Sequence, residues 1–324
     1  MEGTPKNSPS PSRGGRGQGM GVTGDGLLLL DKPVGVSSFQ ALYPVKRIFR
    51  GRKIGHAGTL DPAASGLLVV GVGSGTRLLE FLEGLPKRYR FEVRLGVTTD
   101  TYDLEGQTLE TKDASHVTRE QLEAVLPKFR GTISQMPPVY SAIKIQGKRA
   151  CDRVRAGETV TLSPRNVRID RLELLGFESG IATIEMDCSK GTYVRTIAHD
   201  IGIELGCGAA ANNIRRLAVG PFKVESGVAP DAITGAKDLL PVENAVDHMP
   251  SIKLRSDSWA VALLHGNPVP AAGYVPMPRS EAVAAMAGME DTTCGIFSQE
   301  GKLLAIGTVT PLGHVNPRKV LQPA

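Results

Sequence analysis

The distribution of hydrophobic residues along the chain predicts several strands. The segments GLLLLDKP at 26–33 and LLVVGVG at 67–73 are continuous apolar runs, which indicate buried strands. In the segments 89–96 and 181–187, apolar and polar residues alternate with a period of two. This alternation is typical of a strand that packs one face on a core and leaves the other face in water.

A different spacing predicts helices. Apolar residues recur at helical intervals behind Ser37 or Ser38, either of which is a suitable N-cap. The segment 118–129 opens with a Thr-x-x-Gln capping box, and 192–205 also has a helical pattern. Strands and helices follow one another irregularly, not in a repeating strand–helix–strand order. We therefore expect an α+β fold with a mixed or antiparallel sheet.

Differences in composition and in hydrophobic pattern divide the chain into three parts. Residues 1–24 are rich in Gly, Pro and Ser and lack the apolar run of a signal peptide, so we expect a disordered tail. Residues 25–250 hold the strands and helices described above and are predicted to form the main domain. From 251 to 324, short β-like pieces alternate with Gly and Pro turns, as in VALLHGNPVP and GKLLAIGTVTPLG. This last part is predicted to be a small β-rich domain.

Composition and charge narrow the class of protein. Of the 324 residues, 41% are hydrophobic and 22% charged, and no apolar run approaches the roughly 18 residues of a membrane helix, so we expect no membrane partner. Lys and Arg outnumber Asp and Glu by 38 to 33, which gives a net charge of +5. Clustering of the basic residues favours a nucleic-acid partner over an ordinary solvated face. These clusters lie at 46–47, 50–53, 87–90, 144–155 and 215–216.

The cysteines and histidines give no sign of a metal. The four cysteines are far apart without a Cys-x-x-Cys pair, and no two histidines have the spacing of zinc ligands. The sequence therefore predicts neither a disulfide framework nor a metal site, and we expect reduced thiols in a cytoplasmic protein.

Two further motifs have simpler interpretations than the chemistry they suggest. GVGSGTRL at 71–78 lacks the residues of a phosphate-binding loop and is interpreted as a turn from a strand into a helix. Asp100 and Asp103, in TTDTYDLEG, could form a glycosidase carboxylate pair. The Thr, Asp and Gly content favours a loop held by side-chain-to-backbone hydrogen bonds instead.

Asp61 is the carboxylate that most needs an explanation. It lies in GHAGTLDPAASG, among small residues directly before a predicted buried strand. Burial of an ionised Asp is costly unless a cation pairs with it, so Asp61 either caps a helix or is held for chemistry. The stretch CSKGTYVRT offers a partner, because a turn at Gly191 is followed by Tyr193 and Arg195. We expect Arg195 to be able to pair with Asp61.

Six ordered blocks of the sequence resemble the bacterial TruB family, the tRNA pseudouridine-55 synthases. The blocks are DKPVGVSS at 31–38, GHAGTLDPAASGLLVVGVGSGTRL at 55–78, KRYRFEVRLGVTTDTYDLEG at 87–106, QMPPVYSAIKIQGKRA at 135–150, CSKGTYVRTIAHDIG at 188–202 and IRRLAVGPF at 214–222. The resemblance implies a pseudouridine synthase catalytic domain at 25–250 and a PUA-like RNA-binding domain at 251–324. It also implies an isomerase that acts on the T arm of tRNA and needs no cofactor.

The resemblance also implies roles for particular residues. Asp61 corresponds to the nucleophile, Tyr89 to the tyrosine that lies against the target base and takes part in proton removal, and Arg195 to the cation paired with the carboxylate. Isomerisation of uridine requires an ionised carboxylate, an enclosed pocket and a base extruded from its stack. Whether the carboxylate attacks C1′ or C6, or forms a glycal by elimination, stays open.

Further residues are expected at the substrate. By the same resemblance, His56 holds the target loop, Tyr193 and Ile214 line the pocket, and Lys32 has a supporting role beside the substrate.

Two alternatives remain. One is the archaeal and eukaryotic relative that works in a guide-RNA particle, although the block KIQGKRA favours the stand-alone form, which we expect to be a monomer. The other is a non-catalytic RNA-binding or tRNA-folding protein, in which Asp61 would be structural.

Overall fold

The structure is a computed structural model that describes residues 24–141, 144–145, 147–277 and 292–321. The predicted tail at 1–24 lies outside the described residues apart from Gly24. Within the described part of the chain, no helix is long and apolar enough to cross a membrane.

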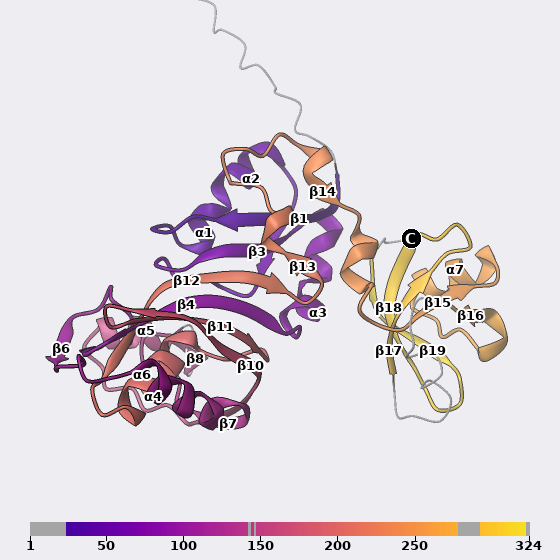
Figure 1. Ribbon diagram of the computed structural model, residues 1–324. Coiled ribbons are helices and arrows are strands. Elements are labelled where there is room, and N and C mark those ends of the chain that lie inside the picture. Colours follow the sequence, from indigo (N-terminus) through magenta and orange to yellow (C-terminus); the bar gives the residue numbers. More distant parts are fainter. Residues whose placement is uncertain (1–23, 142–143, 146, 278–291, 322–324) are drawn as a thin grey trace, which may run out of the picture.

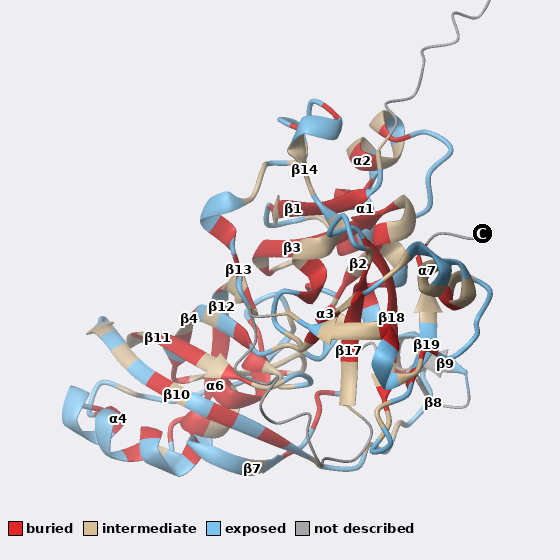
Figure 2. Ribbon diagram, turned by 90° about the vertical axis from the view of Figure 1, so that its right-hand side faces the viewer, coloured by how far each residue is buried: buried red, intermediate tan, exposed pale blue. Residues whose placement is uncertain are grey.

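A mixed ten-stranded sheet forms the larger part of the molecule (Figure 1). Its strands are antiparallel except for the parallel pair β3–β12, so the predicted α+β class with a mixed sheet is confirmed. The strands β1 and β3 are buried along almost their whole length (Figure 2), as their continuous apolar runs predict. In sheet order the strands are β14 (Leu239–Leu240), β1 (Gly26–Lys32), β3 (Ser65–Val72), β12 (Ala209–Val219), β4 (Lys87–Leu95), β11 (Ile181–Cys188), β10 (Arg165–Glu178) and β7 (Gly131–Gln135), with β2 (Ile54–Ala57) on β3 and β13 (Phe222–Lys223) on β12.

Helices cover one face of this sheet at both ends. Strand pairing places Lys32, Gly66, Arg216 and Tyr89 on the same face, because each is the cross-strand partner of the next. At one end this face packs against α1 (Ser38–Ala41) and α2 (Tyr43–Ile48), and at the other against α4 (Arg119–Val125) and α6 (Val194–Glu204). The middle of the face, where Tyr89 and Arg216 lie, is left between the two groups of helices.

The helix boundaries follow local capping chemistry. Ser37 caps α1 and forms a capping box with Gln40, and Thr118 caps α4 in the box that the sequence predicts. The helix expected behind Ser37 is divided in two, because Pro44 lies in the first turn of α2, where a residue without an N–H is tolerated.

Shorter elements complete this part of the chain. GVGSGTRL is a turn from strand into helix, as interpreted from the sequence, and it leads into α3 (Leu79–Glu83). The remaining elements are β5 (Val97–Thr99), β6 (Thr108–Thr111), β8 (Lys144–Ile145), β9 (Lys148–Arg149), α5 (Ala150–Arg155) and 3₁₀ turns at Gly73–Arg77, Leu126–Phe129, Val224–Ser226, Ala236–Asp238, Val242–Val246 and Ala271–Gly273.

A second sheet of five strands follows Pro250. Its order is β16 (Tyr274–Pro276), β15 (Ser251–Leu254), β17 (Thr292–Phe297), β18 (Leu303–Val309) and β19 (Val315–Val320), and α7 (Asp257–Leu264) packs on it. The expectation of β-like structure in VALLHGNPVP is wrong for its first four residues, which end α7. A shared hydrophobic cluster joins this sheet to α3, where Lys319 pairs with Glu80. The domain boundary at 250 stays a prediction.

Candidate active site

A cavity of about 750 Å³ opens between the helices on the face of the sheet that carries Tyr89. Its lining includes side chains from β2, β4, β12 and the start of α6, so residues far apart in the sequence meet there. Most of the residues expected at the site line this cavity, namely His56, Asp61, Tyr89, Tyr193, Arg195 and Ile214.

The turn that carries Asp61 is fixed by hydrogen bonds with Gly35 and with Ser38, the first residue of α1. The Ser38 hydroxyl accepts from the Leu60 N–H at 2.8 Å and donates to the Leu60 carbonyl at 2.9 Å. The Gly35 N–H donates to the Pro62 carbonyl at 2.9 Å. The burial that we expected for Asp61 is wrong, since its side chain is 46% exposed and lines the open cavity.

Arg195 is the buried member of the ion pair. Its Nη2 lies 3.0 Å from Asp61 Oδ2, and its side chain is only 6% exposed. Its Nη1 and Nη2 also donate to the carbonyl oxygens of Thr101 and Tyr140, each at 2.8 Å. The guanidinium therefore cannot swing away from Asp61 without losing buried hydrogen bonds.

Asp103 lies on the other side of Arg195, and we did not expect it there. Its Oδ2 is 3.5 Å from Arg195 Nε, and its side chain is 11% exposed. The predicted loop contacts also exist, because Asp103 Oδ1 accepts from Thr101 Oγ1 at 2.6 Å and from Glu105 N at 3.2 Å. The loop faces Arg195 because the Ala211 N–H of β12 donates to Tyr102 O at 2.9 Å, a contact with no local signal in the sequence.

Tyr193 is held at the start of α6 by an amide side chain. Gln135 donates from Nε2 to the Tyr193 carbonyl at 3.0 Å and accepts from the Tyr193 N–H at 2.8 Å. The preceding turn passes through Gly191 with a φ of +83°, as expected from the sequence. The Arg165 guanidinium lies 5.0 Å from the centroid of the Tyr193 ring, so the ring contributes to a basic wall of the cavity.

Arg216 forms part of the cavity beside Tyr89, and the sequence indicated it only as part of a basic cluster. It is 1% exposed, and its Nε and Nη2 donate to the carbonyl oxygens of Leu67 at 2.7 Å and Gly58 at 3.1 Å. Burial raises the pKa of the Tyr89 phenol, and the nearby Arg216 charge opposes that shift. Burial, and then the same charge, lower the pKa of His56. His56 is therefore neutral at pH 7.

Lys32 does not line the cavity, although we expected it beside the substrate. It is fully buried, and its Nζ donates to the carbonyl oxygens of Pro33 at 2.8 Å, Val36 at 2.6 Å and Pro62 at 3.4 Å. Burial lowers the pKa of Lys32 to about 8, and the charge of Asp61 opposes the shift. Its position suits support of the turn that carries Asp61.

Lys87 resembles Lys32 in its surroundings but does line the cavity. Its Nζ donates to the carbonyl oxygens of Glu83 at 2.5 Å and Leu85 at 2.6 Å. Burial, followed by the charge of Arg216, lowers the pKa of Lys87 to about 8. At pH 7 it remains mostly protonated and adds positive charge to the cavity.

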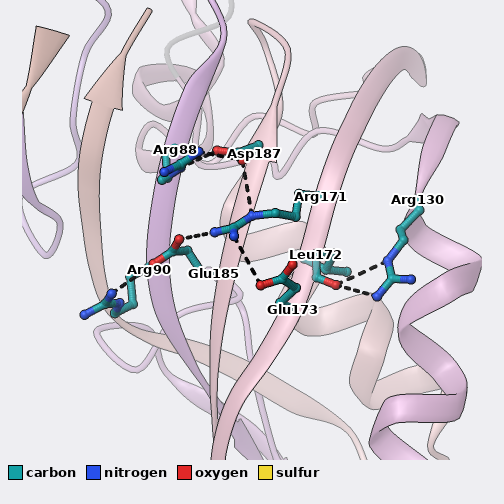
Figure 3. A network of polar contacts seen from close by, with 8 residues as sticks. All are labelled: Arg88, Arg90, Arg130, Arg171, Leu172, Glu173, Glu185 and Asp187. Atoms are coloured by element: carbon teal, nitrogen blue, oxygen red, sulfur yellow. Dashed lines mark hydrogen bonds and ion pairs between the residues drawn. The ribbon is translucent and has the colours of Figure 1, made fainter. Parts of the chain in front are cut away.

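The opposite face of the same strands carries a network of ion pairs (Figure 3). Arg88 Nε lies 2.6 Å from Asp187 Oδ1, and Arg90 Nη2 lies 2.9 Å from Glu185 Oε2. Arg171 pairs with both of these carboxylates. Among the described residues, no group of three or more His, Cys, Asp or Glu is placed to hold a metal ion.

Two family models match the chain. The TruB family pseudouridylate synthase N-terminal domain matches residues 46–194, and the tRNA pseudouridylate synthase B C-terminal domain matches residues 195–247. The predicted PUA-like nature of residues 251–324 lies beyond both matches and stays a prediction.

Curated relatives are similar over most of their length. A tRNA pseudouridine synthase B of Stutzerimonas stutzeri is 40% identical, with 92% of this chain and 95% of the relative covered. The protein of the same name from Brucella abortus is 39% identical, over 94% of this chain and 98% of the relative.

Solved structures share the fold. A protein in an H/ACA RNP bound to a substrate RNA containing 2′-deoxyuridine has a TM-score of 0.69 and 25% identity, over 92% of this chain and 85% of that one. A chain of a Cbf5–Nop10–Gar1 complex has a TM-score of 0.69 and 27% identity, with the same coverage.

Proposed function

This chain belongs to the TruB family of pseudouridylate synthases, and we propose that it isomerises the uridine at position 55, in the T loop of tRNA, with Asp61 as the nucleophile. The observation that carries the proposal is the ion pair of 3.0 Å between Asp61 and the buried Arg195 at an open cavity. Members of this family are isomerases, so the reaction rearranges bonds within one nucleotide.

The chemistry requires an ionised carboxylate beside the ribose and the base. The C1′–N1 bond breaks, the base turns, the C1′–C5 bond forms, and the proton of C5 is lost while N1 ends protonated. Attack at C1′, attack at C6 and glycal formation all use the carboxylate of Asp61. Arg195 holds this carboxylate in place, because its buried guanidinium lies 3.0 Å from Asp61 Oδ2.

Tyr89 is placed to contact the base after it leaves its stack. Burial keeps its phenol neutral at pH 7, which suits packing against an uncharged base. The neutral phenol cannot accept the C5 proton. Proton removal by Tyr89 therefore requires that its own proton leaves first, with N1 as the atom that gains a proton in the reaction, and the adjacent Arg216 charge stabilises the phenolate. We assign His56, Tyr193 and Ile214 to the walls that receive the flipped nucleotide.

The protein is proposed to act alone on tRNA, as a cytoplasmic monomer. The structural neighbours in RNA–protein particles make the guide-dependent mode the alternative. Incubation of the purified protein with an unmodified tRNA transcript, followed by mapping of pseudouridine at each position, tests both points. We expect one modified site, in the T loop, without a guide RNA. Modification spread over the anticodon arm, or none without added factors, would contradict the proposal.

A further inference from the structure

Two aromatic residues on α1 and α2 are exposed to solvent. Phe39 is 57% and Tyr43 is 54% exposed, and their ring centroids lie 5.4 Å apart in an edge-to-face arrangement. Lys46 Nζ lies 3.9 Å from the centroid of the Phe39 ring. These three residues are called the α1–α2 cluster below. Single exposed apolar residues are ordinary, but an ordered aromatic pair under a cation indicates a binding surface.

The charge around the α1–α2 cluster has one sign. Residues 38–55 contain five cations and no Asp or Glu. Arg52 forms an ion pair with Asp25 at 3.3 Å, and in the described residues no ion pair involves the other four cations. Lys46 and Arg47 lie in the last turn of α2, where cations stabilise a helix. This structural role does not account for exposed aromatic rings beside them.

The α1–α2 cluster is also connected, through Ser38, to the turn that carries Asp61. Phe39 follows Ser38, the residue whose hydroxyl binds both the N–H and the carbonyl of Leu60. Leu60 and Thr59 line the cavity. Both α1 and α2 pack over β1 and β3 (Figure 1), on the face of the sheet from which Tyr89 and Arg216 reach the cavity. The cluster therefore lies beside the cavity, and the sheet does not separate the two.

We propose that the α1–α2 cluster binds nucleotides of the RNA substrate outside the cavity, with an unpaired base stacked on the exposed rings and phosphates beside Lys46 and Arg47. This proposal rests on the proposed function, which makes RNA the substrate. Interleaved aromatic and basic side chains are the usual surface for unpaired nucleotides. A protein partner is less well matched, because lysine is depleted at the centre of protein–protein interfaces.

The first test removes both rings. The variant Phe39→Ala/Tyr43→Ala is expected to bind an unmodified tRNA transcript about tenfold more weakly in a filter-binding assay, because base stacking on aromatic residues has this magnitude. Tyr43→Phe keeps a ring and is expected to bind as the wild type does. Ile203→Ala is the matched control, since Ile203 is 60% exposed on α6 and has no role in the site.

The second test separates stacking from charge. Lys46→Gln/Arg47→Gln is expected to reduce the magnitude of the slope of log affinity against log salt concentration by about one to two. The reason is that a protein with fewer phosphate contacts releases fewer counterions when it binds. The variant without the two rings is expected to keep the wild-type slope. If that variant melts at a much lower temperature, the single substitution Tyr43→Gln replaces it.

If the ring variants keep both the melting temperature and the tRNA affinity of the wild type, the proposal is overturned. A surface that binds a protein instead of RNA would give this same result. Failure of the proposed function has a different signature. There the wild-type protein would leave every uridine of the transcript unchanged, whereas filter binding would still report whether the rings contact RNA.

Discussion

The two faces of strand β4 hold their cations in different ways. On the outer face, Arg88 and Arg90 pair with carboxylates of β11 (Figure 3). On the cavity face and around it, Lys87 and Arg216 donate to carbonyl oxygens. A neutral carbonyl oxygen accepts the hydrogen bond of a cation and leaves the positive charge in place. A carboxylate accepts the hydrogen bond and also neutralises the charge. The outer face is therefore close to neutral locally, and the cavity keeps positive charge for an anionic substrate.

The largest expected effect in this comparison comes from Asp61, the carboxylate that lines the cavity beside Arg195. Asp61→Asn preserves the side-chain shape and removes the charge that we propose as the nucleophile, so turnover is expected to fall below detection. Binding of tRNA, which depends on basic and stacking contacts elsewhere, is expected to persist. Tritium release from C5-labelled uridine measures turnover, and filter binding measures affinity.

Asp100→Asn is the matched control for that substitution. Asp100 accepts from the Gln107 N–H at 2.8 Å, and an Asn side chain can also accept this bond. Tritium release near the wild-type rate by Asp61→Asn would remove Asp61 from the mechanism.

Arg216→Met tests what a cation bound to carbonyl oxygens contributes to stability and to turnover. The substitution leaves the Leu67 and Gly58 carbonyls without the donors they have now, and the free energy of unfolding is expected to fall by about 3 kcal/mol. Turnover is also expected to fall, because the phenol of Tyr89 loses its neighbouring charge. Urea unfolding and tritium release are the measurements. A turnover that falls only as far as the folded fraction does would restrict Arg216 to a structural role.

The charge of Lys87 predicts a dependence of binding on pH. Burial lowers its pKa to about 8, so the ammonium loses its proton as the pH rises from 7 to 9. Affinity for tRNA is expected to fall several-fold over this interval. Stability changes in the opposite direction, because between this pKa and the unfolded value of about 10.4 the unfolded chain binds more protons, and the free energy of unfolding rises with pH.

Lys87→Arg tests whether the titration of Lys87 causes the loss of tRNA affinity, since a guanidinium stays charged at pH 9. The variant is expected to lose most of the pH dependence of binding. An identical decline in wild type and variant between pH 7 and pH 9 would assign the titration to another group, such as Lys32, whose pKa burial also lowers to about 8.

The smallest effect is expected on the outer face. Arg88 is 46% exposed and its partner Asp187 is 24% exposed, so water screens the pair. Arg88→Ala is expected to change the free energy of unfolding by at most about 1 kcal/mol and to leave turnover unchanged. A double-mutant cycle with Asp187→Ala measures their coupling. A coupling well above that value would show that the outer network also supports the cavity.

Sequence patterns predict the elements of this fold that depend on near neighbours. The Thr118 capping box and the alternation in β4 and β11 involve residues a few positions apart, and the structure confirms them. The end of α7 was taken for β structure because DSWAVALL is short and mostly apolar, so its spacing does not separate helix from strand.

The residues of the site also fall into those that the sequence could predict and those that it could not. The ion pair between Asp61 and Arg195 was expected from their chemistry and from the family resemblance, and it is present. The position of Asp103 depends on its loop contact with Ala211, and that of Arg216 on the register between β12 and β4. Neither arrangement leaves a local pattern, so spacing along the chain could not place these side chains at the cavity.

The parallel pairing of β3 with β12 has a consequence for the order in which the protein matures. Arg215 contacts Ser65 across 150 positions of sequence, so this part of the sheet closes only after most of the chain has been synthesised. Until β12 is synthesised, the nascent chain carries Asp61, Tyr89 and Arg195 but lacks Arg216, and β3 has no partner at Ser65 and Gly66, although β2 already pairs with its other end. Closure of the sheet and completion of the cavity by Arg216 are therefore acquired in the same late step of folding.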